Sequence, residues 1–137
     1  MTRFLVALNA GVFIWSLLPA QKYLLAQWGV RPRCYIAPSG CGIALPQEAE
    51  LLWQPLFGSM FLHGDVLHLA FNMLFLWVFA PGLEEKLGRI KFLVFYLACG
   101  IGASLAHIAT HPFSGVPAIG ASGAISGVLG AYFILLT

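Results

Sequence analysis

The chain has 137 residues, of which 60% are hydrophobic and only 9% are charged. Soluble domains have roughly a quarter charged residues, so this chain lacks the polar groups needed to cover a water-exposed surface. A net charge of +2 without a dense basic run argues against nucleic-acid binding. The composition therefore indicates an integral membrane protein in contact with the lipid bilayer.

Long stretches without Asp, Glu, Lys or Arg predict the membrane helices. A bilayer core of about 30 Å requires about 20 helical residues. We predict an all-α, polytopic transmembrane helical bundle in one domain, residues 1–137, with spans at about 3–18, 67–81, 92–110 and 122–137. The first span is interpreted as retained rather than as a cleaved signal peptide.

Turn-forming residues are frequent in the predicted first loop, residues 21–60. Cys34 and Cys41 lie in this loop on either side of Pro38 and Gly40. They are able to pair if the loop lies in an oxidising compartment, and two free thiols are the alternative. Lys and Arg occur in loops on both sides, so the positive-inside rule gives no orientation.

The fourth predicted span is still apolar where the sequence stops at Thr137. Its sixteen residues rise only about 24 Å, and no cap or flanking charge follows. We therefore expect the chain to be the N-terminal part of a longer protein. Cys99, within the third span, is expected to be a packing residue.

Polar residues cluster where the second span begins, in the stretch FLHGDVLHLAFNM. His68 and Asn72 are four residues apart and share one helix face, and His63 precedes them. This spacing also occurs in zinc sites, but Asn is a poor zinc ligand and no third ligand is evident, so we predict no metal. The alternative is a pair of polar side chains that hydrogen-bond between helices.

The fourth span opens with Gly120-Ala-Ser122-Gly123. Small neighbours around a serine are typical of nucleophile motifs, because they permit a sharp turn and close approach of a substrate. At a helix N-terminus, free N–H groups also favour an oxyanion. The alternative is that Ser122 is only a helix N-cap. Ser126, one turn later, lies within the helix and is interpreted as a packing residue.

Glycines continue along this span at positions 123, 127 and 130. With Gly120 they form a ridge without side chains, which permits another helix to approach closely. No helix in the sequence clearly requires this ridge. We therefore predict that Gly123, Gly127 and Gly130 line an open groove, which a later helix fills in the full-length protein.

Three motifs together resemble the rhomboid intramembrane serine proteases. They are His63-x4-His68-x3-Asn72-Met73 entering the second span, Glu84-x3-Gly88-Arg89 in the next turn, and Gly120-Ala-Ser122-Gly123 opening the fourth. Their order and placement match over residues 53–137, and the combination is far more specific than any one motif.

The resemblance implies a Ser–His dyad that cleaves transmembrane protein substrates without a cofactor. Ser122 is then the nucleophile, and its N–H with the side chains of His68 and Asn72 forms the oxyanion hole. His63, Gly120 and Gly123 support the site.

The resemblance further implies that Glu84, Gly88 and Arg89 stabilise the turn on the opposite side of the membrane. It also implies an outward-facing first loop and a cytoplasmic N-terminus, as in a multi-pass protein of the bacterial inner membrane.

Two departures from the family pattern are evident. The family's base histidine lies on a sixth span, beyond this sequence, and we interpret His107 and His111 as interface or loop residues rather than as bases. Trp53 is followed by Gln54 instead of the Arg that many members carry. The alternatives are a non-catalytic rhomboid-like protein that binds membrane clients and a small transporter with a broken helix.

Overall fold

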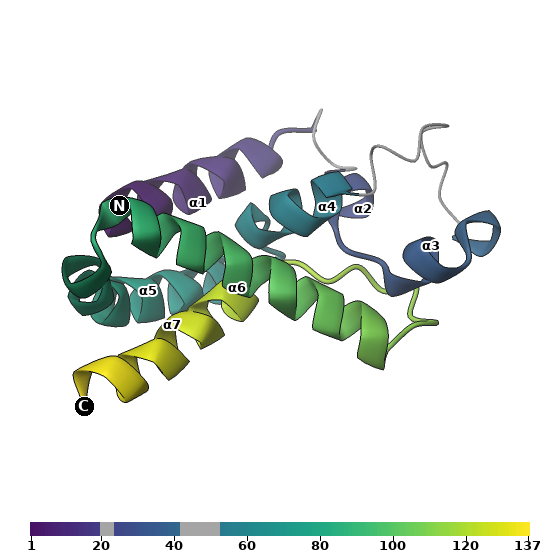
Figure 1. Ribbon diagram of the computed structural model, residues 1–137. Helices are drawn as coiled ribbons and strands as arrows, with labels where there is room; N and C mark the ends of the chain where they lie inside the picture. Colours follow the sequence, from purple (N-terminus) through teal and green to yellow (C-terminus); the bar gives the residue numbers. More distant parts are fainter. Residues whose placement is uncertain (20–23, 42–52) are drawn as a thin grey trace.

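The computed structural model describes residues 1–19, 24–41 and 53–137 (Figure 1). All regular elements in these residues are helical, which confirms the predicted all-helical fold. The four longest helices are α1 (Thr2–Ser16), α5 (Val66–Leu87), α6 (Arg89–Thr110) and α7 (Ser122–Leu136). The shorter elements are the helices α2 (Leu24–Trp28), α3 (Pro32–Ile36) and α4 (Trp53–Gly58) and the 3₁₀ turns η2 (Pro38–Gly40) and η4 (Ser59–Phe61).

Helices α5 and α6 are long and apolar enough to cross a membrane. Each has 22 residues, which corresponds to about 33 Å of helix. Helices α1 and α7 lie where the first and fourth spans were predicted, and both are apolar. They have 15 residues each, about 22 Å, so within the described residues only α5 and α6 reach the full thickness of a bilayer core.

Helix α5 continues through Pro81 to Leu87, so the predicted end of the second span at Pro81 is wrong. A proline inside a helix removes one backbone hydrogen bond, which a long helix tolerates when packing supports both halves. Leu76, Ala80 and Leu83 provide that packing, because they lie on one face on both sides of the proline and are fully buried.

The turn between α5 and α6 is a single residue, Gly88, at a φ of 82° that favours glycine. Residues 82–91, which the predicted spans left as a turn, are therefore helical apart from Gly88. Glu84 Oε2 accepts hydrogen bonds from the N–H and the Oγ1 of Thr2, both at 2.7 Å. Arg89 Nε lies 3.8 Å from Glu84 Oε1, and its side chain is 82% exposed. Glu84 thus binds mainly the first turn of α1, a contact that the sequence did not predict.

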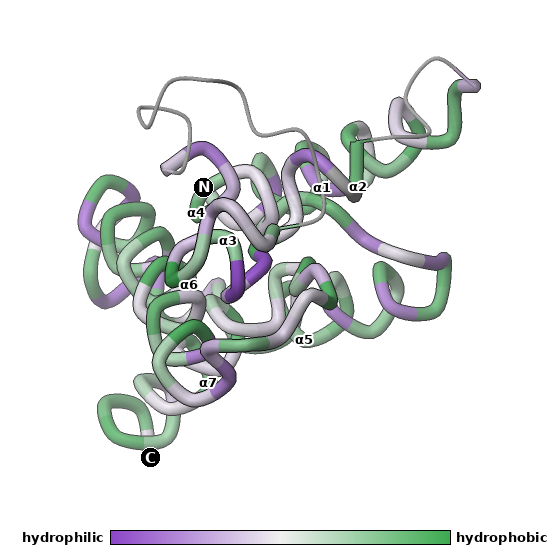
Figure 2. Tube along the Cα trace, turned by 90° about the vertical axis from the view of Figure 1, so that its right-hand side faces the viewer, coloured by the Kyte–Doolittle hydropathy of each residue, from purple (hydrophilic) through white to green (hydrophobic). Residues whose placement is uncertain are grey.

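Helix α7 packs against both α5 and α6, and α1 packs against α5 (Figure 1). Their contacts form one apolar core, which includes Leu5, Leu76, Phe92, Tyr96, Ala124 and Val128. Large apolar side chains are also exposed on these helices, and much of the Cα trace of the helices is hydrophobic (Figure 2). The most exposed of them include Phe4, Ile14, Leu67, Phe71, Ile90, Val94 and Ile134. An outer surface of this kind suits contact with lipid rather than with water.

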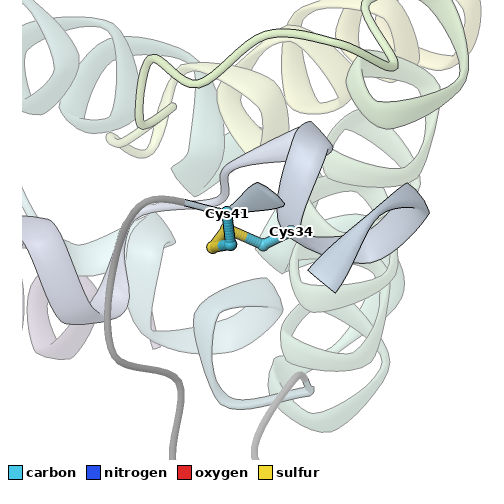
Figure 3. Close-up of a disulfide and its surroundings, with 2 residues drawn as sticks. All are labelled: Cys34 and Cys41. Atoms are coloured by element: carbon cyan, nitrogen blue, oxygen red, sulfur yellow. A yellow bond between two sulfur atoms is a disulfide. The ribbon is translucent and has the colours of Figure 1, made fainter. Parts of the chain in front are cut away.

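The described parts of the first loop contain short helices where the sequence suggested only turns. Positions 21–23 and 42–52 of the predicted loop lie outside the described residues. Cys34 and Cys41 form a disulfide (Figure 3), which decides between the two states that the sequence left open. Cys99 is a free, partly buried thiol, as expected for a packing residue.

Candidate active site

Gly120 forms the turn that leads into α7. Its φ is 108°, a conformation that side-chain-bearing residues rarely adopt. Its N–H donates to the carbonyl of Ser59 at 2.8 Å. A Cβ at this position would lie 2.7 Å from His68 Nε2 and 3.6 Å from Asn72 Nδ2. The turn therefore requires glycine for its backbone conformation and also for the space that His68 and Asn72 occupy.

His68 and Asn72 lie on the first two turns of α5. Asp65 caps this helix, because its side chain accepts a hydrogen bond from the N–H of His68 at 2.8 Å. Asn72 is buried, and its Nδ2 has no hydrogen-bond partner among the described residues. Such a group costs free energy unless a partner is supplied, and a ligand oxygen is one such partner. The structure thus brings two predicted site residues to Gly120, two positions before Ser122.

His63 packs edge-on against His68, with 5.1 Å between the ring centroids. The side chain is only 2% exposed. Burial, and then the neighbouring His68, lower the pKa of His63 to about 4. The His63 ring is therefore neutral at pH 7 and limits the positions available to the His68 ring, in keeping with the supporting role that the sequence suggested.

Ser122 is the first residue of α7, where the sequence placed the start of the fourth span. The N-cap is Ala121, and no side chain caps the helix, so the N-cap interpretation of Ser122 is wrong. The side chain is exposed. Its hydroxyl makes no hydrogen bond to the described part of the chain, and it sits beside the free N–H groups of the first turn. This placement suits a reactive serine better than a capping one.

The other serine of this helix has a different setting. Ser126 Oγ donates to the carbonyl of Ser122 at 2.8 Å. This local bond satisfies the hydroxyl within the helix. The residue is exposed, so the packing role expected for Ser126 is wrong.

A cavity of about 210 Å³ lies beside Ser122, between the first turn of α7 and the C-terminal half of α6. Its polar lining includes Ser59, Ser104, His107 and Ser122. His68 and Asn72 are not among its lining residues. The sequence placed His107 at an interface or in a loop and missed this position. His68 and Asn72 lie beside Gly120, and His68 also contacts His63. Their convergence with Ser122 in an oxyanion hole stays a prediction.

The glycine ridge of α7 is filled by α6, so the predicted open groove along Gly123 and Gly127 is wrong. A Cβ at Gly123 would lie 2.5 Å from the Cβ of Ala103, and one at Gly127 would overlap Cys99 Sγ. Small residues on α6 thus face the glycines of α7 and let the two backbones approach closely. Gly130 has nothing within 4 Å of such a Cβ and alone fits the prediction.

Comparison with known proteins agrees with the motifs. The Rhomboid domain family matches residues 50–137. The rhomboid-family protein YdcA of Bacillus subtilis is 33% identical over 136 residues, 99% of this chain and 62% of YdcA. The rhomboid protease GluP of the same organism is 47% identical over 79 residues, 58% of this chain and 15% of GluP.

A mitochondrial relative extends the likeness beyond bacteria. The mouse presenilin-associated rhomboid-like protein is 29% identical over 132 residues, 93% of this chain and 30% of that protein. The chain thus spans less than two thirds of the length of these relatives. No solved structure gives a significant match. The domain match and these identities show that the chain belongs to the rhomboid family of intramembrane proteases.

Proposed function

We propose that the full-length protein is an intramembrane serine endopeptidase that cleaves transmembrane protein substrates, with Ser122 as the nucleophile. The observation that carries this proposal is the Gly120 turn. It places Ser122 at the start of α7 and, two residues earlier, accommodates the His68 ring and the buried Asn72 amide. A hydroxyl at a helix N-terminus and side-chain donors beside it are the parts that acyl transfer requires.

In this mechanism the Ser122 oxygen attacks the scissile carbonyl. Negative charge then develops on the carbonyl oxygen, and the N–H of Ser122 with the side chains of His68 and Asn72 stabilise it. Asn72 Nδ2 suits this role because it is buried and lacks another partner in the described residues. The proton of Ser122 passes to a histidine that the family pattern locates beyond Thr137. The first loop faces outwards, where its disulfide is stable, and the N-terminus is cytoplasmic.

The experiment is cleavage of a fluorogenic transmembrane substrate by the full-length protein in liposomes, compared among single alanine variants. His68→Ala and Asn72→Ala should each lower kcat by about 10²–10³-fold, because each removes one donor to the developing charge. KM should change little, since these donors act mainly in the transition state.

His107→Ala is the matched control, because His107 lines the cavity beside Ser122, whereas the atoms nearest to a Cβ at Gly120 belong to His68 and Asn72. This variant should cleave within about threefold of wild type. If it abolishes cleavage while His68→Ala does not, the base and oxyanion roles are assigned to the wrong histidines. If the wild-type protein binds transmembrane clients without cleaving any, it is instead the non-catalytic rhomboid-like protein considered above.

A further inference from the structure

The first loop is fastened to the segment that leads into Ser122. Val30 and Ala118 exchange both backbone hydrogen bonds, at 2.9 and 2.8 Å, and form an isolated antiparallel bridge. Three residues further along the loop, the N–H of Arg33 donates to the carbonyl of Ser114 at 3.0 Å. Val30 is completely buried. Residues 30–33 therefore act as a strap along residues 114–118, held by three backbone hydrogen bonds.

The strap ends at a disulfide. Cys34 follows Arg33 directly and is bonded to Cys41, and both cysteines are buried (Figure 3). Between them lie the end of α3 and the turn η2, which together comprise only a few residues. Helices this short are not stable by themselves in water, so a covalent link contributes much of the order in this part of the loop.

The strapped segment is continuous with the active-site turn. Ala118 lies two residues before Gly120, whose N–H is bound by Ser59. A Cβ at Gly29 would lie 2.5 Å from the Cβ of Pro117, so the loop also packs tightly on the side chains of this segment. Because so few residues separate Ala118 from Gly120, a movement of the strap should also move the Gly120 turn.

We propose that the Cys34–Cys41 pair is a redox site whose reduction releases the strap and lowers cleavage at Ser122. This inference rests on the proposed protease function. The reductant is a dithiol. One of its thiolates attacks a sulfur of the pair to form a mixed disulfide, and its second thiol then displaces that sulfur. The dithiol is oxidised to a disulfide, and its two protons end on the thiols of Cys34 and Cys41.

Reduction favours local opening for a physical reason. The reduced loop has many more conformations available, and the strap's three backbone hydrogen bonds and the buried Val30 then oppose them without the covalent link. Once the strap is open, the segment before Gly120 is held by fewer contacts. Misplacement of a nucleophile by about 1 Å is enough to lower a rate by about a hundredfold, so a partly mobile turn should lower cleavage by about tenfold.

The test uses the full-length protein in detergent, oxidised or treated with dithiothreitol. A maleimide label, located by peptide mass spectrometry, should modify Cys34 and Cys41 only after reduction. Amide hydrogen exchange of residues 30–33 and 114–120 should then become at least about tenfold faster. Cleavage should fall by about tenfold and recover on reoxidation. The double variant Cys34→Ser/Cys41→Ser should show the exchange and cleavage rates of the reduced protein, and dithiothreitol should change neither rate.

If reduction exposes the thiols of Cys34 and Cys41 to labelling but amide hydrogen exchange in residues 114–120 does not become faster, the coupling between the loop and the turn is overturned. Faster exchange with unchanged cleavage would overturn the regulatory role. Failure of the protease proposal is distinguishable from both, because an oxidised protein that cleaves nothing still reports the coupling through hydrogen exchange.

Discussion

Replacing Ser122 by alanine should reduce cleavage by the full-length protein to the uncatalysed background, a loss of at least about 10⁴-fold. The reason is that nucleophile and base act as a unit, so the loss of either forfeits most of the rate acceleration. The loss should appear in kcat, because the hydroxyl contributes little to substrate binding. Initial rates on a fluorogenic transmembrane substrate, with single-turnover kinetics to separate binding from chemistry, provide the measurement.

Ser126→Ala is the matched control for this variant. It removes a hydroxyl one turn further along the same helix face, and that hydroxyl is already bonded to the Ser122 carbonyl. Its effect should stay within about threefold. Residual cleavage above about 1% in Ser122→Ala, or an equal loss in Ser126→Ala, would contradict the assignment of the nucleophile.

Replacing Gly127 by valine should abolish cleavage while the protein remains inserted in the membrane. The sequence suggested that a later helix contacts the glycine ridge. The structure shows instead that Gly127 faces Cys99 of α6. A side chain at Gly127 would overlap Cys99 Sγ and push α7 away from α6. Since α7 carries Ser122 at its first residue, the displacement should move the nucleophile away from the groups beside Gly120. Cleavage rate and the amount of membrane-integrated protein should be measured together.

Two further variants separate steric displacement from a general effect of valine. Gly130→Val introduces the same side chain where nothing lies within 4 Å, so cleavage should fall by less than about threefold. Cys99→Gly combined with Gly127→Ala should be more active than Gly127→Ala alone, because a Cβ at position 127 overlaps both Sγ and Cβ of Cys99, and glycine removes both atoms. Equal losses in Gly127→Val and Gly130→Val would show that contact with α6 is not the cause.

The sequence predicted the start of α7 correctly, because local backbone chemistry determines where this helix begins. The glycine before Ser122 marked a turn, and the following apolar run marked a helix, so the start of α7 at Ser122 could be predicted. His68 and Asn72 were recognisable because polar groups are costly inside an apolar span unless they have a function or a partner. Their shared contact with Gly120 depends on how α5 and α7 pack, which no local pattern specifies.

The errors have a common cause, which is tertiary packing. Pro81 resembled a helix end, but burial of Leu76 and Leu83 on either side keeps α5 continuous. The glycine ridge was assigned to a later helix because no helix in the sequence clearly required it. Its partners, Ala103 and Cys99, are small but not glycines, and only the structure identifies them. The contact between Glu84 and Thr2 likewise joins residues far apart in the sequence.

The most direct test of the central claim is covalent capture of the nucleophile. The full-length protein in liposomes should react with a fluorophosphonate probe, and peptide mass spectrometry should locate one adduct, on Ser122. Prior incubation with a transmembrane substrate should slow this labelling, and Asn72→Ala should slow it strongly, because the probe's phosphoryl oxygen occupies the oxyanion position. An adduct on Ser104 or Ser126 instead, or cleavage that continues after Ser122 is fully modified, would contradict the account.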